Sequence, residues 1–187
     1  MLEYVVVYPW VVDIAKTQRL PLVLKKRPEH LEGMLNLPGG KINECESIVD
    51  AAAWELLEET GLEQVQDYDP MCYCPAEHLG TIQGTKSLIH CVRVPIVSRQ
   101  ELKPGATEDE EVKWYSMPDL LRLPSLMPNL RLVIPLMDCS AKDWIIRDLD
   151  SNWRQSSYHK VTLVFAEKEP MVVQVRSCKF YELEEEE

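Results

Sequence analysis

Residues 40–62 read GKINECESIVDAAAWELLEETGL, and this stretch carries helix signals at both of its ends. Ser47 is a suitable N-cap, and Asp50 three residues later completes a pattern that resembles a capping box. Gly61 stands where a left-handed C-terminal residue is preferred. Apolar residues recur at i, i+4 spacing along two neighbouring rows, which are Ile48, Ala52 and Leu56, and Val49, Ala53 and Leu57. The stretch therefore predicts a helix over residues 47–60 with one apolar face.

Three glutamates of this helix, Glu55, Glu58 and Glu59, fall on one patch of its surface. Residues three and four apart share a helix face, so Glu58 and Glu59 both lie beside Glu55, one turn further on. The predicted helix contains no Lys or Arg that would balance these charges. One interpretation is an ordinary solvated acidic surface. The other is a site for a hard divalent cation, which takes carboxylate oxygens and leaves room for water and phosphate.

The loop before the helix favours the cation site. Gly39 and Gly40 follow Pro38 and let the backbone approach a ligand closely, so that a carbonyl oxygen can join the coordination shell. A metal held there would withdraw charge from a bound pyrophosphate and lower the pKa of a bound water, which would then attack phosphorus. A spare carboxylate can accept the proton. The chemistry that these residue types suggest is hydrolysis of a pyrophosphate bond.

The stretch resembles the signature of the Nudix hydrolase family, GX5EX7REUXEEXGU, in which U is a bulky aliphatic residue. Every fixed position is matched except the Arg of the family, which is replaced by Trp54. The resemblance extends upstream through LPLVLKKRPEHLEGMLNLPGG and downstream through EDEEVKWYSMPDLLRLP, so that it covers residues 3–137. It implies an α/β fold, an α/β/α sandwich around a mixed β-sheet, in which the signature forms a loop–helix–loop.

The resemblance also implies roles for the matched residues. Glu58 and Glu59 would bind Mg²⁺ or Mn²⁺, and Glu55 would be a further ligand or the base, so that all three carboxylates are catalytic. Glu46 would support the architecture of the signature. Gly40 would offer a backbone carbonyl oxygen to the metal.

Further contacts would come from outside the helix. Gly39 would contact the substrate or supply the carbonyl oxygen in place of Gly40. Family members often recruit another carboxylate from a second loop. The candidates are residues 108–111, with Glu110 or Glu111 preferred as a metal ligand. A solvated acidic turn is an equally good interpretation of each of these residues.

Three residues are candidates for contacts with the rest of the substrate. Lys25 and Arg27 end a predicted strand and could meet a phosphate, since Arg suits bidentate contact and Lys acts as a point charge. A plain polar strand end is the alternative. Trp114 could form one wall of a base-binding pocket, because aromatic rings stack on bases. The alternative is a core position, which is more common for a Trp on a short strand.

Trp54 bears on whether the site catalyses hydrolysis. The family Arg orders the signature through ion pairs with its glutamates, whereas Trp has no charge and a single N–H donor. Without that cation, the carboxylate pKa values should rise until a metal binds. We favour an active hydrolase because the three helix carboxylates are retained. The alternative is a catalytically weak or inactive Nudix-fold module that binds a nucleotide or has a regulatory role.

The chain is expected to form a single domain over residues 1–187. Strands are predicted over residues 3–12, 21–26, 87–97 and 111–115, and helices over residues 118–123 and 129–137. Pro95 should interrupt the strand over residues 87–97 or place it at an edge. Residues 140–181 should extend the same domain with a β-hairpin made of strands 161–165 and 171–175. Residues 182–187 should form an acidic tail.

Composition restricts the partners. The formal net charge of −11 disfavours bulk nucleic acid and anionic membranes, whereas a divalent metal can neutralise a small nucleotide substrate. The six cysteines and four histidines show no metal-ligand spacing. No signal peptide or membrane span is predicted in the apolar N-terminal residues. We therefore expect a cytoplasmic protein with free thiols.

The substrate is left open by the sequence, because the signature recognises diphosphate and metal rather than the attached group. The resemblance implies a nucleoside diphosphate derivative, which could be a nucleoside triphosphate, ADP-ribose or a dinucleotide. The strand over residues 161–165 could pair edge to edge in a homodimer. Packing within its own domain is an equally good interpretation.

Overall fold

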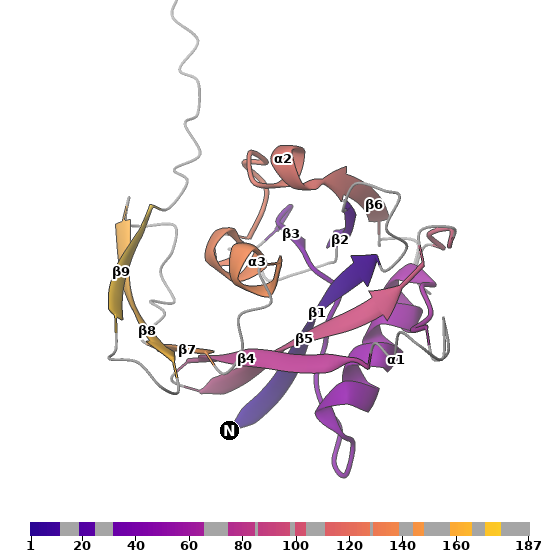
Figure 1. Ribbon diagram of the computed structural model, residues 1–187, viewed down its shortest axis with the longest axis horizontal. Helices are drawn as coiled ribbons and strands as arrows, with labels where there is room; N and C mark the ends of the chain where they lie inside the picture. Colours follow the sequence, from indigo (N-terminus) through magenta and orange to yellow (C-terminus); the bar gives the residue numbers. More distant parts are fainter. Residues whose placement is uncertain are drawn as a thin grey trace, which may run out of the picture.

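Two β-sheets and three helices make up the described part of the protein (Figure 1). The computed structural model describes residues 1–11, 19–24, 32–65, 75–84, 86–97, 100–103, 111–127, 129–138, 144–147, 158–165 and 171–176. The larger sheet has six strands in the order β1-β5-β4-β7-β8-β9. Their bounds are Leu2–Val11 for β1, Glu77–Gln83 for β4, Ser87–Ile96 for β5, Trp144–Arg147 for β7, Tyr158–Phe165 for β8 and Met171–Arg176 for β9.

The larger sheet is mixed, as the sequence predicts. β1 runs parallel to β5 and β4 runs parallel to β7, while the β5–β4, β7–β8 and β8–β9 pairs are antiparallel. The smaller sheet is antiparallel throughout, in the order β3-β2-β6. Its bounds are Arg19–Leu24 for β2, Leu35–Asn36 for β3 and Glu111–Ser116 for β6.

Strand β1 is buried on both faces, which explains its nearly continuous apolar run. Successive side chains point to opposite faces of a sheet. Val5 and Val7 pack with α1 (Ile48–Thr60) in one core cluster. Val6 and Tyr8 pack with α2 (Met117–Leu120) and α3 (Leu130–Asp138) in the other. Helix α1 thus lies on one side of the sheet, with α2 and α3 on the other (Figure 1). The expected α/β/α sandwich is confirmed.

The ends of α1 follow the local signals in its sequence. The backbone N–H of Asp50 donates to the Ser47 hydroxyl oxygen at 3.1 Å, and that hydroxyl donates to the Asp50 carboxylate at 2.6 Å. Gly61 has a φ of 71°, and its N–H donates to the Leu57 carbonyl at 2.8 Å. The predicted N-cap and left-handed C-terminal glycine are both confirmed.

Pro95 does not interrupt β5, which corrects one expectation for residues 87–97. Strand β5 lies between β1 and β4, but its pairing with β4 ends where Glu77 stands opposite Arg93. Pro95 lies past that point, opposite Trp10 of the parallel strand β1. A proline lacks the N–H that a central ladder would need. Its position at the end of the β4 pairing makes it compatible with a central strand.

Strands β3, β4 and β7 were not among the expected elements. The pairing of β4 with β5 is irregular between His78 and Gly80, so β4 lacks a clean two-residue alternation. Helix α2 ends at Leu120, earlier than the predicted helix over residues 118–123, because residues 121 and 122 form a turn. The acidic tail predicted at residues 182–187 lies outside the described residues.

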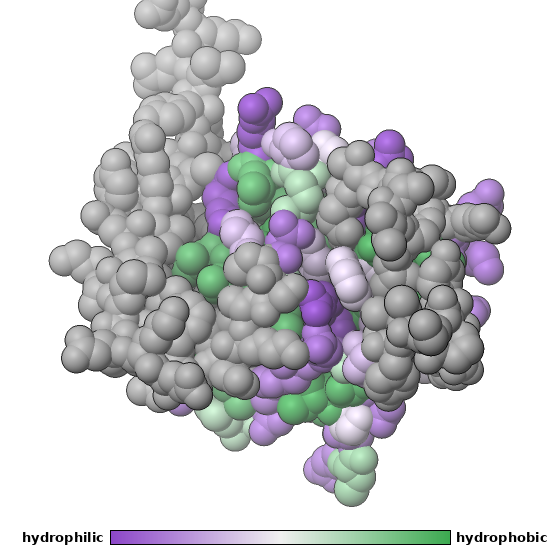
Figure 2. All heavy atoms as spheres, in the orientation of Figure 1, coloured by the Kyte–Doolittle hydropathy of each residue, from purple (hydrophilic) through white to green (hydrophobic). Residues whose placement is uncertain are grey.

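The surface of the described residues mixes polar and apolar side chains. On the face drawn in Figure 2, purple hydrophilic residues are interspersed with small green hydrophobic patches. Across the ranges that the structure describes, we find no helix with the length and apolar character needed to cross a membrane.

Candidate active site

Helix α1 holds its three clustered glutamates in different environments. Glu59 is buried, with 4% of its surface exposed, whereas Glu55 is half-buried and Glu58 is exposed. The helix period explains the difference. Glu55 and Glu59 are four residues apart and share the side that meets the preceding loop, and Glu58 is rotated away from that side.

Glu59 ties the helix to the loop. The backbone N–H of Gly39 donates to Oε2 of Glu59 at 2.9 Å. The same loop is fixed to β1, since the N–H of Val5 donates to the carbonyl of Gly40 at 2.9 Å. A Cβ added at Gly39 would overlap the carbonyl oxygen of Val5. Only glycine therefore fits where the loop passes between α1 and β1.

The carboxylate of Glu55 lies directly over Gly40. A Cβ added at Gly40 would overlap both carboxylate oxygens of Glu55, so this carboxylate occupies the space that a side chain would fill. The two consecutive glycines thus let Glu55 and Glu59 reach the same short stretch of backbone.

The arrangement suits a hard divalent cation in its chemistry. Carboxylate oxygens from neighbouring helix turns stand beside a glycine backbone, and Mg²⁺ and Mn²⁺ prefer such oxygen donors. Among the described residues, no three His, Cys, Asp or Glu side chains converge as a metal-binding group. Glu58 is exposed on the neighbouring part of the helix surface, whereas Glu55 and Glu59 contact the glycine backbone.

Glu46 lies in the turn that leads into α1. Its Oε2 accepts hydrogen bonds from the backbone N–H of Asn43 at 3.0 Å and from the Asn43 side-chain amide at 3.1 Å. Cys45, between them, has a positive φ of 66°. A non-glycine residue in that region is uncommon, and the Glu46 contacts help to hold the turn. The supporting role of Glu46 in the signature stays a prediction.

Trp54 lies on the outward side of α1, with 57% of its surface exposed. Leu57, three residues on, is 39% exposed on the same side. Glu58 follows Trp54 by four residues, so their side chains leave adjacent parts of the helix surface. The residue that replaces the family Arg is therefore a solvent-facing aromatic ring next to a predicted metal ligand.

The predicted substrate contacts are described only in part. Lys25, Arg27 and Glu110, together with residues 108 and 109, lie outside the described residues. Glu111 is exposed at the start of β6 and pairs with Lys113, and the hydrogen bond and charge of Glu111 raise the pKa of Lys113. Trp114 is half-buried and packs against the core cluster that contains α1.

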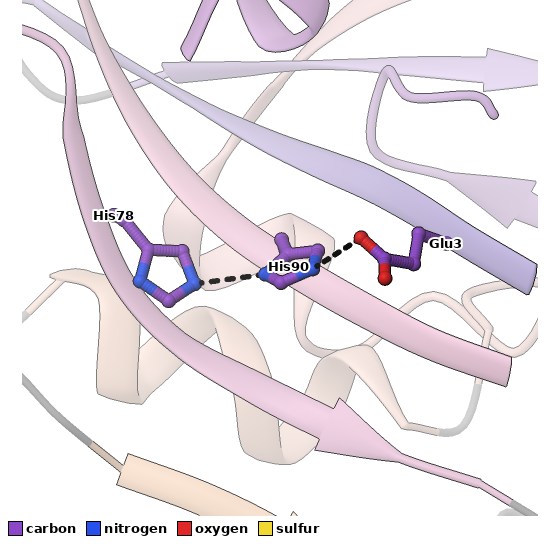
Figure 3. A network of polar contacts seen from close by, with 3 residues as sticks. All are labelled: Glu3, His78 and His90. Atoms are coloured by element: carbon purple, nitrogen blue, oxygen red, sulfur yellow. Dashed lines mark hydrogen bonds and ion pairs between the residues drawn. The ribbon is translucent and has the colours of Figure 1, made fainter. Parts of the chain in front are cut away.

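A polar network across three strands was not anticipated (Figure 3). Nδ1 of His90 lies 3.2 Å from Nε2 of His78, and Nε2 of His90 lies 3.5 Å from the Glu3 carboxylate. The sequence shows no link between the two histidines, because the strand that contains His78 is not among the predicted elements. The two contacts use opposite nitrogens of one imidazole ring. The three groups therefore form a chain of contacts rather than one shared cation site.

A groove beside Trp54 was also not anticipated. Its volume is about 600 Å³, and it is lined by Asp50, Ala53, Trp54, Leu57, Glu63 and Gln64. The first four residues follow the i, i+3, i+4, i+7 spacing of one helix face. Glu63 and Gln64 come after the helix ends, where no periodic signal connects them to that face.

Comparison with known proteins settles the family. A family model described as NUDIX domain matches residues 7–137. The chain belongs to the Nudix family. This membership confirms the predicted family and supports a pyrophosphohydrolase enzyme. A search of curated protein sequences found no significant match.

Solved Nudix structures share the fold of this Nudix protein at low sequence identity. A NUDIX-family hydrolase from Clostridium perfringens is 20% identical, with a TM-score of 0.54, and the match covers 73% of this chain and 96% of that one. The NUDIX domain of Shewanella oneidensis NrtR, in complex with ADP ribose, is 22% identical, with a TM-score of 0.57 and coverage of 74% and 87%. A MutT structure from work on Aliivibrio salmonicida and Vibrio cholerae is 18% identical, with a TM-score of 0.53 and coverage of 74% and 98%.

Proposed function

We propose that the protein hydrolyses a pyrophosphate bond in a nucleoside diphosphate derivative with the help of Mg²⁺ or Mn²⁺. The observation that carries this proposal is the packing of Glu55 and Glu59 against the backbone of Gly39 and Gly40. It places two carboxylates at a backbone segment without side chains, where an anionic substrate could approach only if its charge were neutralised.

Glu55, Glu58 and Glu59 are the residues that would hold the cation. When bound, the cation would neutralise phosphate charge and lower the pKa of a bound water. Glu59 keeps the loop in place through its hydrogen bond from Gly39. Glu55 is the candidate base, because a half-buried carboxylate next to the reacting phosphorus can accept the proton that the attacking water loses.

Other residues are proposed as secondary contacts. The carbonyl of Gly40 already accepts the Val5 N–H, and its second lone pair remains suitable for a cation. The acidic segment that ends at Glu111 is the proposed source of another carboxylate. Lys25 and Arg27 are proposed to meet substrate phosphate groups, for which their charge suits them.

The substrate is proposed to be a nucleoside triphosphate, ADP-ribose or a dinucleotide. The shared chemistry is a pyrophosphate linked to at least one nucleoside. The Shewanella oneidensis NrtR domain of similar fold was solved with ADP ribose, which supports ADP-ribose as one of the candidates.

A second candidate function is a nucleotide-binding or regulatory module with weak turnover or none. Trp54 favours it, because this exposed indole cannot make the ion pairs that a guanidinium would make. The retained carboxylates favour hydrolysis.

Activity with a panel of nucleotides tests the proposal. Products would be measured with Mg²⁺ or Mn²⁺ for wild type, Glu58→Gln and Glu59→Gln, with Glu44→Gln as a control for loss of an exposed carboxylate from the preceding loop. We expect a loss of at least ~100-fold in kcat for the first two variants, in line with removal of a metal or acid–base group. A kcat that is unchanged in both variants would contradict a role for this helix in hydrolysis. Metal-dependent nucleotide binding without turnover would favour the nucleotide-binding or regulatory module.

A further inference from the structure

The outward face of α1 has an unusual aromatic surface beside the proposed catalytic carboxylates. Trp54 is 57% exposed and Leu57 is 39% exposed. Among the described residues, the other exposed large hydrophobic side chains are at the N-terminus, in Met1 and Leu2. The outward face of an amphipathic helix is normally polar. An exposed Trp within a well-formed helix therefore points to a binding role.

The groove next to Trp54 has the size of a small-molecule site. Its volume of about 600 Å³ lies within the range of roughly 300–1,000 Å³ that is common for ligand pockets. Trp54, Ala53 and Leu57 give it an apolar wall along the helix. Glu63 and Gln64, just after the helix ends, complete the lining.

The polar groups of the groove select against phosphate. Asp50 and Glu63 supply carboxylates and Gln64 supplies an amide, and none of the described lining residues is Lys or Arg. Carboxylates repel a phosphate but accept hydrogen bonds from N–H groups. The ligand chemistry that fits is a flat ring with N–H donors at its edge. A purine base with an exocyclic amino group has this form.

Trp54 also lies close to the proposed reaction centre. Glu58 is four residues further along α1, which corresponds to a rise of about 6 Å along the helix axis. A ring stacked on Trp54 would thus lie within roughly the length of a sugar of Glu58 along the helix axis. The groove and the exposed Glu58 therefore lie on adjacent parts of the surface of α1.

We propose that this groove binds the purine base of the substrate, stacked on the indole of Trp54 and held at its edge by Glu63 and Gln64. The proposal rests on the proposed function for its choice of a nucleotide ligand. It assigns Trp54 to substrate binding in the position where the family has an Arg. The presence of Trp54 in place of that Arg therefore provides a base contact and gives up an ion pair with the helix glutamates.

Binding of AMP and GMP in EDTA tests the proposal without any need for turnover. Affinity would be measured by titration calorimetry and by quenching of Trp fluorescence, with ribose 5-phosphate as the ligand that lacks a base. We expect AMP or GMP to bind and ribose 5-phosphate to bind much more weakly. Trp54→Ala should weaken nucleotide binding roughly 10- to 100-fold, since stacking contributes ~1–3 kcal/mol per base. Trp54→Phe keeps an aromatic face and should retain most of the affinity.

Matched variants separate base binding from a general effect on the helix. Leu2→Ala removes another exposed apolar side chain and should leave nucleotide affinity unchanged. Glu63→Gln should reduce the preference for bases with N–H donors. Equal affinity of wild type and Trp54→Ala would overturn the proposal, and so would equal losses in Trp54→Phe and Trp54→Ala. A wild-type dimer that Trp54→Ala dissociates in sedimentation would assign this face to a second copy of the chain and also overturn it.

Failure of the proposed hydrolase function would give a different set of results from failure of the groove proposal. If no nucleotide is hydrolysed but AMP or GMP still binds in EDTA in a Trp54-dependent way, the groove proposal stands and the hydrolase proposal falls. If hydrolysis occurs, Trp54→Ala should raise KM while Glu58→Gln lowers kcat. An unchanged KM in Trp54→Ala would overturn the groove proposal and leave the hydrolase proposal intact.

Discussion

The backbone N–H of Gly39 donates a hydrogen bond of 2.9 Å to the carboxylate of Glu59. This bond joins the last turn of α1 to the loop that precedes the helix, across the surface of β1. Glu59 is 4% exposed, and its bond adds to the backbone hydrogen bonds that fix the loop to β1. One residue thus combines a structural contact with a predicted place in the metal site.

Replacing Glu59 should separate its structural role from its charge. Glu59→Ala leaves the Gly39 N–H without its acceptor and should lower the free energy of unfolding by about 1–3 kcal/mol. Glu59→Gln keeps an acceptor oxygen, so it should lose catalysis while destabilising less than Glu59→Ala. Urea denaturation of each variant measures the difference. The exposed Glu58→Gln serves as the control and should change stability by less than ~0.5 kcal/mol. Equal stability of Glu59→Ala and Glu58→Gln would contradict the role assigned to the bond.

Gly40→Ala should displace the Glu55 carboxylate. The added Cβ would overlap both carboxylate oxygens, and the long Glu side chain can move aside more easily than the backbone can. We expect a loss of roughly 10- to 100-fold in kcat, as is typical when a catalytic group is misplaced. The fold should remain, which circular dichroism would verify.

Two other glycines provide matched comparisons for Gly40. At Gly84 an added Cβ lies 3.2 Å from the Ser87 hydroxyl oxygen, so Gly84→Ala should affect activity little. At Gly39 the added Cβ meets the backbone of Val5, so Gly39→Ala should destabilise the whole protein. Full activity of Gly40→Ala would show that the position of Glu55 is irrelevant to the reaction.

The N-cap of α1 should contribute measurably to stability. Ser47 accepts the Asp50 N–H at 3.1 Å, and Ser47→Ala removes that acceptor. The expected loss is about 1 kcal/mol in the free energy of unfolding. Ser47→Asp retains a capping oxygen and should lose less, although it adds a charge beside Asp50. Thermal and urea unfolding of the two variants would check the order, and an equal loss in both would argue against capping.

Local features explain why α1 could be predicted from the sequence. Its cap, its apolar rows and its terminal glycine all lie within residues 47–61, and each acts through neighbours in the chain. The Nudix signature likewise lies within one continuous stretch, and the family model confirms the membership that it predicts. The expected β1 strand follows from its nearly continuous apolar run.

Contacts between distant segments explain what the sequence could not show. Helical spacing places Glu55, Glu58 and Glu59 on one patch, but the burial of Glu59 depends on how the loop pairs with β1. The contact between His78 and His90 depends on the register of β4 with β5, which an irregularity shifts. Such relationships require the register of paired strands, and one sequence does not specify it.

The two described cysteines should differ sharply in reactivity. Cys45 is exposed, and Cys91 is buried in the core. Burial raises the pKa of the Cys91 thiol well above its usual value, because the thiolate would lose its hydration. Iodoacetamide should therefore modify Cys45 in the native protein and reach Cys91 only in urea, which peptide mass spectrometry can follow.

The same burial predicts a loss of stability at alkaline pH. The Cys91 thiol stays neutral in the folded protein, whereas the unfolded chain releases its proton once the pH exceeds the ordinary thiol pKa. The unfolded state then binds fewer protons than the folded state, so the free energy of unfolding should fall as pH rises through and above that value. Cys91→Ala cannot ionise, so its stability should fall less steeply over the same alkaline range, even though it starts lower because of the smaller side chain. Parallel slopes for wild type and Cys91→Ala would contradict this linkage, and urea denaturation at a series of pH values would measure them.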